Sequence, residues 1–214
     1  SWVSIIEEQF FGNPQKLNAR ALEAQLVNKP YLNEGYGWPE MPGKAYANPD
    51  ELRRDHWAIT MAGGYGTYAD GTDHAYLTGQ PGRGQAKKTL LMLRRLLETM
   101  PYWELTPNNT IVEGDAMCLT NNEDIFVVYL PNGRTTSLNL KQRKSPAGVD
   151  LARLTDVLVW WNPRTGKIET SNLITGKERL VLTPPSVQDD WVALLIGNSR
   201  YVEMSKWLQR TEGQ

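Results

Sequence analysis

The first 100 residues repeat one pattern three times, and this repeat constrains the fold more than any other feature of the chain. A short apolar run is followed by a loop and then by a segment with helical periodicity. Strands that alternate with helices indicate a parallel sheet with right-handed crossovers. The predicted strands are residues 2–6, 31–33 and 63–69, and the predicted helices are residues 14–28, 51–62 and 84–99.

The three loops that follow the predicted strands, residues 7–13, 34–49 and 70–83, are longer than the connections from helix to strand. This asymmetry is typical of a (β/α)8 TIM barrel, whose working face lies at the C-terminal ends of the strands. Three units cannot close a barrel of eight strands. We therefore expect the last three βα units of a barrel, with about five units missing upstream.

The composition changes near Pro101, where short apolar runs separated by turn signals replace the helical pattern. Such a pattern predicts a small antiparallel β-sandwich. The expected fold class is thus α/β plus all-β. The expected domains are a truncated barrel portion at 1–103, a β-sandwich at 104–198 and a tail at 199–214 that either forms a short helix or frays.

Glu34 is the residue that we select for chemistry. It follows the apolar run Tyr31-Leu32, and the carboxyl end of a buried parallel strand is where a barrel presents catalytic side chains. Hydrolysis of a glycosidic bond uses two carboxyl groups. Tyr36 and Trp38 lie nearby in the sequence and could stack on the apolar face of a sugar. The alternative is a surface glutamate at the end of a strand.

Two further tyrosines, Tyr65 and Tyr68, lie in the third predicted strand. Either could bind sugar or form a hydrogen bond with Glu34, and packing in the core is an equal alternative. Because glycine is a poor strand residue, the glycines around them predict the close approach of another backbone or a ligand. Glu7 and Glu8 end the first strand, where we favour solvated charges over a pocket.

The remaining polar motifs give weaker signals. His56 lies in the middle of a predicted helix and is interpreted as a packed histidine. Asp70, Asp73 and His74 match no recognised spacing of metal ligands, so no metal is expected. Residues 82–84 (Gly-Arg-Gly) precede a helix and could hold an anion, although a plain loop is the preferred interpretation. No cofactor is predicted.

Composition excludes several classes of partner. Lys+Arg number 23 and Asp+Glu 24, and without a basic stripe nucleic acid is not the expected partner. Eight Trp and nine Tyr against three Phe favour rings with a polar group, as at carbohydrate-contacting surfaces, or alternatively at the edges of a core. The single Cys118 excludes an internal disulfide, and no apolar run reaches the length of a membrane span.

The chain begins Ser-Trp-Val, directly in a predicted strand and with neither an initiator Met nor a signal peptide. We expect a truncated or processed chain. Any targeting signal would then lie upstream.

Several segments together resemble a known two-domain arrangement. Residues 126–133 (Phe-Val-Val-Tyr-Leu-Pro-Asn-Gly), 160–166 (Trp-Trp-Asn-Pro-Arg-Thr-Gly) and 183–192 resemble the small domain described as a "putative collagen-binding domain of a collagenase". Residues 33–98 are similar to the end of the apiosidase-like, DUF4038-type glycoside hydrolase barrel that such a domain commonly follows. The carrying motifs there are Asn33-Glu34, Arg54-Asp55-His56-Trp57, Gly63-Gly-Tyr-Gly-Thr-Tyr68 and the helix that ends Arg94-Arg95-Leu96-Leu97-Glu98.

The resemblance implies a retaining-type or related glycosidase with one carboxylate after the seventh strand and another after the fourth. Glu34 matches the first position, and the second would lie upstream. The family often carries a second glutamate in a closely spaced Tyr-Glu, whereas here Glu40 stands further along, behind Trp38-Pro39. Glu34 is our choice between the two.

Two functions remain open. The first is a fragment of a secreted or periplasmic glycoside hydrolase that acts on plant or microbial polysaccharide and is inactive as an isolated chain, because one catalytic carboxylate is missing. The alternative is a non-catalytic or structural module that binds carbohydrate or collagen. An exposed Trp160 or Trp161 would then contact the sugar.

Overall fold

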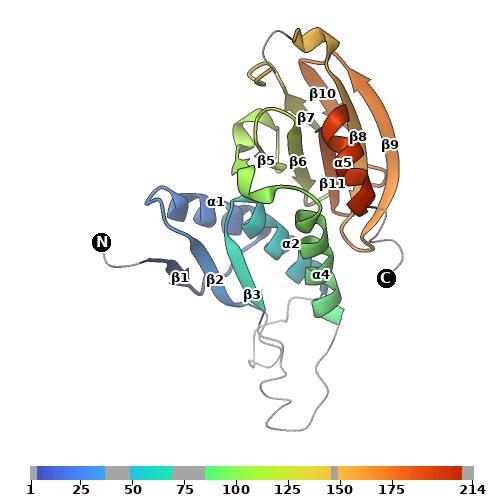
Figure 1. The fold of residues 1–214 in the computed structure, drawn as a ribbon. Coiled ribbons are helices and arrows are strands. Elements are labelled where there is room, and N and C mark those ends of the chain that lie inside the picture. The colour runs from blue at the N-terminus through green and yellow to red at the C-terminus, as the bar shows by residue number, and fades with distance from the viewer. Residues whose placement is uncertain (1–3, 37–48, 69–84, 146–148, 209–214) are drawn as a thin grey trace. The chain divides into compact units, whose positions relative to one another are not determined.

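The computed structural model describes residues 4–36, 49–68, 85–145 and 149–208 (Figure 1). The chain divides into two compact units, residues 1–91 and 92–214. The boundary falls inside helix α4 (Gln85–Glu98).

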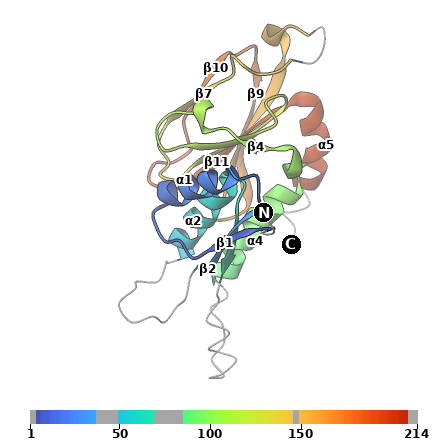
Figure 2. The same cartoon turned by 90° about the vertical axis from the view of Figure 1, so that its left-hand side faces the viewer.

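The first unit is built on a parallel sheet with the strand order β1-β2-β3. Helices α1 and α2 lie side by side against it (Figures 1 and 2). The alternation of strand and helix predicted this parallel pairing correctly. The elements are β1 (Ile6–Glu8), α1 (Pro14–Gln25), β2 (Tyr31–Tyr36), α2 (Pro49–Met61) and β3 (Tyr65–Tyr68).

Helix α1 begins where the sequence signals it. The side chain of Asn13 accepts a hydrogen bond from the Lys16 backbone N–H at 3.0 Å, and Pro14 occupies the first turn. The buried face of the helix carries Leu17 and Ala21, and Asn18 Nδ2 donates to the Ala58 carbonyl of α2 at 2.8 Å. The cap and this buried hydrogen bond therefore fix α1 against α2.

The glycines of the third strand make room for neighbouring side chains. A Cβ on Gly66 would lie 2.8 Å from His56 Cδ2, and a Cβ on Gly64 would lie 2.9 Å from Tyr31 Cδ1. The glycines predicted the close approach of another backbone or a ligand; in the structure the close neighbours are the side-chain rings of His56 in α2 and Tyr31 in β2.

The second unit contains one large antiparallel sheet with the strand order β4-β5-β6-β11-β8-β9 and a two-stranded sheet, β10-β7. Helix α5 contacts β8 and β11. The elements are β4 (Thr106–Pro107), β5 (Met117–Thr120), β6 (Ile125–Leu130), β7 (Thr136–Asn139), β8 (Thr155–Asn162), β9 (Lys167–Thr175), β10 (Arg179–Leu182), β11 (Trp191–Gly197) and α5 (Asn198–Leu208), with 3-10 turns at Tyr102–Glu104, Asn109–Ile111 and Leu151–Arg153.

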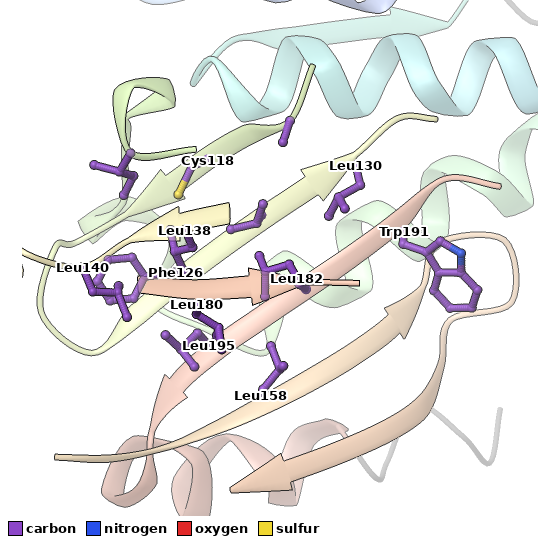
Figure 3. Packing of buried hydrophobic residues seen from close by; sticks show 14 of the residues in the cluster. Cys118, Phe126, Leu130, Leu138, Leu140, Leu158, Leu180, Leu182, Trp191 and Leu195 are labelled. Carbon is purple, nitrogen blue, oxygen red and sulfur yellow. The ribbon is translucent and has the colours of Figure 1, made fainter. Parts of the chain in front are cut away.

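A hydrophobic cluster lies between these two sheets (Figure 3). Alternate residues of β6, such as Phe126 and Leu130, meet Leu138 of β7 and Leu182 of β10. The only cysteine, Cys118, is fully buried in the same cluster, and burial raises the pKa of its thiol. Burial of apolar surface on this scale is the main stabilising contribution to the second unit.

A buried ion pair stands at one end of this core. Arg143 donates from both terminal nitrogens to the Asp156 carboxylate, at 2.6 and 2.7 Å, and both side chains are almost fully buried. The guanidinium carbon lies 5.5 Å from the centre of the Phe126 ring. Two buried charges are tolerated here because each satisfies the other with bidentate hydrogen bonds.

The predicted fold class, the last three βα units of a TIM barrel followed by a small antiparallel β-sandwich, is wrong. The described residues form a mixed α/β structure with four helices and three separate sheets. The first sheet is open, and the second half combines sheets of six and two strands with a helix. Hydrophobic periodicity identifies strands and helices, but it does not fix how many strands join a sheet or whether the sheet closes.

No helix in the described ranges is long and apolar enough to cross a membrane.

We predict that Gly66→Ala destabilises the first unit by about 1–3 kcal/mol, because the added methyl group collides with the His56 ring. Urea denaturation measures the loss. In a His56→Ala background the same substitution should cost less, since the obstacle is gone. An equal cost in both backgrounds would show that the His56 contact is not the cause.

We predict that Asp156→Asn costs about 3–5 kcal/mol of unfolding free energy, because it leaves the Arg143 charge buried without a counter-ion. The matched control is Glu113→Gln, which breaks the exposed pair with Arg179 and should cost less than about 1 kcal/mol. Urea denaturation of the two variants compares them. Equal losses would mean that the buried pair has no special weight.

Candidate functional site

One face of the parallel sheet brings together side chains from neighbouring strands. Glu7 of β1 pairs in register with Leu32 of β2, and Leu32 pairs with Tyr65 of β3. Because side chains alternate along a strand, Glu34 lies on the same face as Leu32 and therefore on the face of Glu7. This face carries Tyr65 with 56% of its surface exposed. We call Glu7, Glu34 and Tyr65 the carboxyl face.

The opposite face of the sheet packs against the helices. Arg20 of α1 donates to both oxygens of the Glu8 carboxylate, at 2.7 and 2.8 Å, and the Tyr31 hydroxyl donates to Glu8 Oε1 at 2.8 Å. These bonds, that from Arg20 above all, hold the pKa of Glu8 below its ordinary value even though burial opposes them. Glu8 is thus a structural residue that ties α1 to β1 and β2.

Asn33 fixes the chain that follows β1. It is fully buried, its Oδ1 accepts from the Phe10 N–H at 2.9 Å, and its Nδ2 donates to the Phe10 carbonyl at 2.9 Å. A side-chain amide that satisfies both backbone groups of one residue replaces a rung of the sheet. Sequence reasoning treated Asn33 only as the neighbour of Glu34. The strand-ending Asn-Glu pair was the available signal for this role.

Glu7 and Glu34 lie on the same face of two paired strands, and Glu7 is the neighbour that most affects the titration of Glu34. Two neighbouring carboxylates repel each other unless one of them holds a proton. The hydrogen bond with Glu7, followed by the charge of Glu7, accordingly raises the pKa of Glu34 above its ordinary value. The sequence favoured solvated charges for Glu7 and Glu8. The structure places Glu7 beside Glu34 and binds Glu8 to Arg20 and Tyr31.

The other residues selected for sugar binding are described only in part. The backbones of Tyr36 and Tyr68 pair in β2 and β3, while their side chains lie outside the described part of the chain. Trp38 and Glu40 lie outside the described residues altogether. Tyr65 is therefore the selected aromatic side chain that can be placed on the carboxyl face.

His56 is a packed helix residue, in agreement with its interpretation from the sequence. The ring is buried against Gly66, with Nδ1 3.0 Å from the Leu52 carbonyl oxygen and Nε2 3.2 Å from the Thr67 carbonyl oxygen. Burial lowers the pKa of the ring despite both carbonyl contacts.

The sequence motifs considered for metal or anion binding, Asp70, Asp73, His74 and residues 82–84, lie outside the described residues. In the part of the chain that is described, no three His, Cys, Asp or Glu side chains are grouped to hold a metal ion.

The two tryptophans proposed as exposed sugar contacts in the second unit are core residues. Trp160 is 5% exposed and Trp161 2%, so that expectation is wrong. Trp160 packs edge-to-face on Trp191, with ring centres 6.4 Å apart, and the guanidinium carbon of Arg164 lies 4.9 Å from the centre of the Trp191 ring. Strand β8 is buried on both faces, which a run of adjacent aromatics cannot reveal by itself.

One known family model matches part of the second half of the chain. Residues 101–196 match the family model described as "Putative collagen-binding domain of a collagenase". This matches the resemblance in the sequence for that region, whereas no comparison shows the apiosidase-like DUF4038 family. No curated protein matches the chain.

The solved structures that resemble the chain include two glycoside hydrolases. One is named "Glycoside hydrolase" (TM-score 0.71, 16% identity, 86% of this chain and 46% of that one). The other is a glycoside hydrolase family 5 protein from Bacteroides vulgatus (TM-score 0.71, 17% identity, 93% of this chain and 51% of that one). At these identities the likeness is one of fold. The chain spans about half the length of either structure.

We predict that Glu7→Gln lowers the pKa of Glu34 toward its ordinary value, because it removes the neighbouring carboxyl group that disfavours ionisation. Carbon-detected NMR titration of the Glu34 carboxyl measures the shift, and Glu23→Gln, elsewhere in the same unit, is the control. If Glu34 titrates identically in the wild type and in Glu7→Gln, the two side chains do not interact.

The interaction between Glu7 and Glu34 also makes the stability of the fold depend on pH. A raised pKa means that the folded chain holds the proton of Glu34 more firmly than the unfolded chain does. The contribution of this pair to stability is therefore present at low pH and is lost as the pH rises through the titration of Glu34.

Proposed function

We propose that the chain is part of a glycoside hydrolase that acts on O-glycosidic bonds of polysaccharides or oligosaccharides, and that Glu34 is one of its two catalytic carboxyl groups. The observation that carries the proposal is a carboxyl pair on the open face of a parallel sheet, close to the strand ends. The fold similarity to two glycoside hydrolases supports it. The apiosidase-like, DUF4038-type family is the more specific proposal for the parent enzyme.

Glu34 is suited to this chemistry by its accessibility and its neighbour. A glycosidase needs one carboxylic acid that protonates the leaving oxygen and one carboxylate that attacks the sugar or activates water. A carboxyl group with a raised pKa keeps its proton closer to neutral pH, and such groups recur at catalytic positions. Tyr65, on the same face, would offer an aromatic surface and a hydroxyl to the sugar.

Glu7 does not take the part of the second catalytic group. Carboxyl groups in direct hydrogen-bond contact are closer than the about 5 Å of retaining enzymes and much closer than the separation in inverting enzymes. Its role is therefore to set the protonation of Glu34. The second catalytic carboxyl group has to come from a part of the protein other than β1 and β2.

The substrate class bears on location. Plant and microbial polysaccharides are found outside the cytoplasm, so the proposed localisation is secreted or periplasmic. The proposed partners are a carbohydrate substrate and, through the second unit, a matrix polymer such as collagen or polysaccharide.

The test compares the protein translated from the complete reading frame with its Glu34→Gln variant on aryl-glycosides and soluble polysaccharides. The wild type should release reducing sugar, and Glu34→Gln should lower kcat by about 10²–10⁴-fold, since it removes an acid–base group while keeping its size. Glu23→Gln, on the outer side of α1, is the matched control and should keep wild-type activity.

Two results would contradict this proposal in different ways. Full activity in Glu34→Gln would move the chemistry to another carboxyl group. Absence of hydrolysis by the wild type on every substrate would favour the second candidate, a binding module in residues 101–196, which the family match to a collagen-binding domain supports.

A further inference from the structure

The second unit exposes one aromatic pair at the start of the region that matches the family model. Trp103 is 75% exposed and Tyr102 43%, whereas Trp160, Trp161 and Trp191 are at most 5% exposed. Tryptophan is strongly buried on average. Two adjacent exposed rings form an apolar patch, and such patches mark places where a ligand or partner binds.

The two rings are held in a fixed arrangement. They meet edge to face, with centres 5.7 Å apart and planes at 72°. Both lie on the 3-10 turn Tyr102–Glu104, where the Glu104 N–H donates to the Pro101 carbonyl at 2.9 Å and the Leu105 N–H donates to the Tyr102 carbonyl at 3.1 Å. Because the surface is preformed, binding would cost little additional ordering.

The turn that carries the two rings also carries a charged residue. Glu104 follows Trp103 directly, and its Oε2 is 4.0 Å from Nη2 of Arg200 in α5. Arg200 is positioned by Asp124, whose Oδ2 accepts a hydrogen bond from Arg200 Nε at 3.1 Å. The turn of the aromatic pair therefore has both a hydrogen-bond acceptor, Glu104, and a nearby donor, Arg200.

We propose that Tyr102 and Trp103 form a carbohydrate-binding platform, with Glu104 and Arg200 as its polar rim. The C–H face of a sugar ring is apolar and stacks on an aromatic ring, while its hydroxyl groups need partners of both kinds at the edge. The platform extends the proposed function, on which its substrate class rests, because it would bind a polysaccharide through residues of the second unit.

The chemistry of the patch favours a sugar over other polymers. Proline-rich chains such as collagen bind in grooves lined by several aromatic side chains. In the described part of the second unit, Tyr102 and Trp103 are the aromatic side chains among the large exposed apolar residues. Glu104 and Arg200 carry opposite charges, and such a mixture does not favour a partner of strong charge of either sign.

Affinity gel electrophoresis of the 214-residue chain tests the platform. The probes are soluble xylan, mixed-linkage β-glucan and pectin, with type I collagen in a parallel solid-phase assay. We expect at least one polysaccharide to retard the wild type, Trp103→Ala to weaken that binding at least tenfold, and Trp103→Phe to keep part of it because a ring remains. Leu173→Ala, an exposed apolar truncation on β9, should bind like the wild type.

Three results would overturn the proposal: no polysaccharide binds, Trp103→Ala binds as the wild type does, or only collagen binds. Circular dichroism of each variant confirms that the fold is kept, as expected for side chains on the surface. Binding requires no turnover. A chain that binds sugar without hydrolysing it therefore supports the platform while the hydrolase proposal fails. Hydrolysis without binding that depends on Trp103 supports the hydrolase proposal while the platform fails.

Discussion

The alternation of side chains along two paired parallel strands governs the first unit. The register that sets Glu7 beside Leu32 sends Glu8, Tyr31 and Asn33 toward the helices and leaves Glu7 and Glu34 on the other face. On the helix side Glu8 is bound by Arg20 and Tyr31. The accessible carboxyl pair depends on that buried network, since a slip of one residue would exchange the two faces.

The second unit follows a different rule, because both faces of its main strands are buried. Strands β6, β8 and β11 contain almost no exposed residue. Their tryptophans therefore serve packing, and the buried charges of Arg143 and Asp156 satisfy each other with bidentate hydrogen bonds. Exposed groups of this unit include the 3-10 turn at Tyr102–Glu104 and the outer strand β9, seven of whose nine residues are exposed.

The sequence was sufficient for the local features of the fold and insufficient for its closure. Asn13-Pro14 predicted the start of α1, and the alternation of segments predicted parallel pairing. The glycines of β3 signalled a close approach, but only the structure shows that His56 and Tyr31 make it. Glu7 was undervalued because pairing between strands 25 residues apart, such as Ile6 with Tyr31, is not written in local periodicity. The prediction that Trp160 or Trp161 is exposed was wrong, because a strand that is buried on both faces shows no alternation of apolar and polar residues in its sequence.

The single buried thiol of Cys118 can be used to measure how often the second unit opens locally. The chain has no other cysteine, and this one is fully covered in the core with its thiolate disfavoured. An alkylating reagent can reach it only when β5 separates from its neighbours. The labelling rate of the unmodified protein therefore measures the frequency of that fluctuation, without an introduced probe and without interference from the first unit.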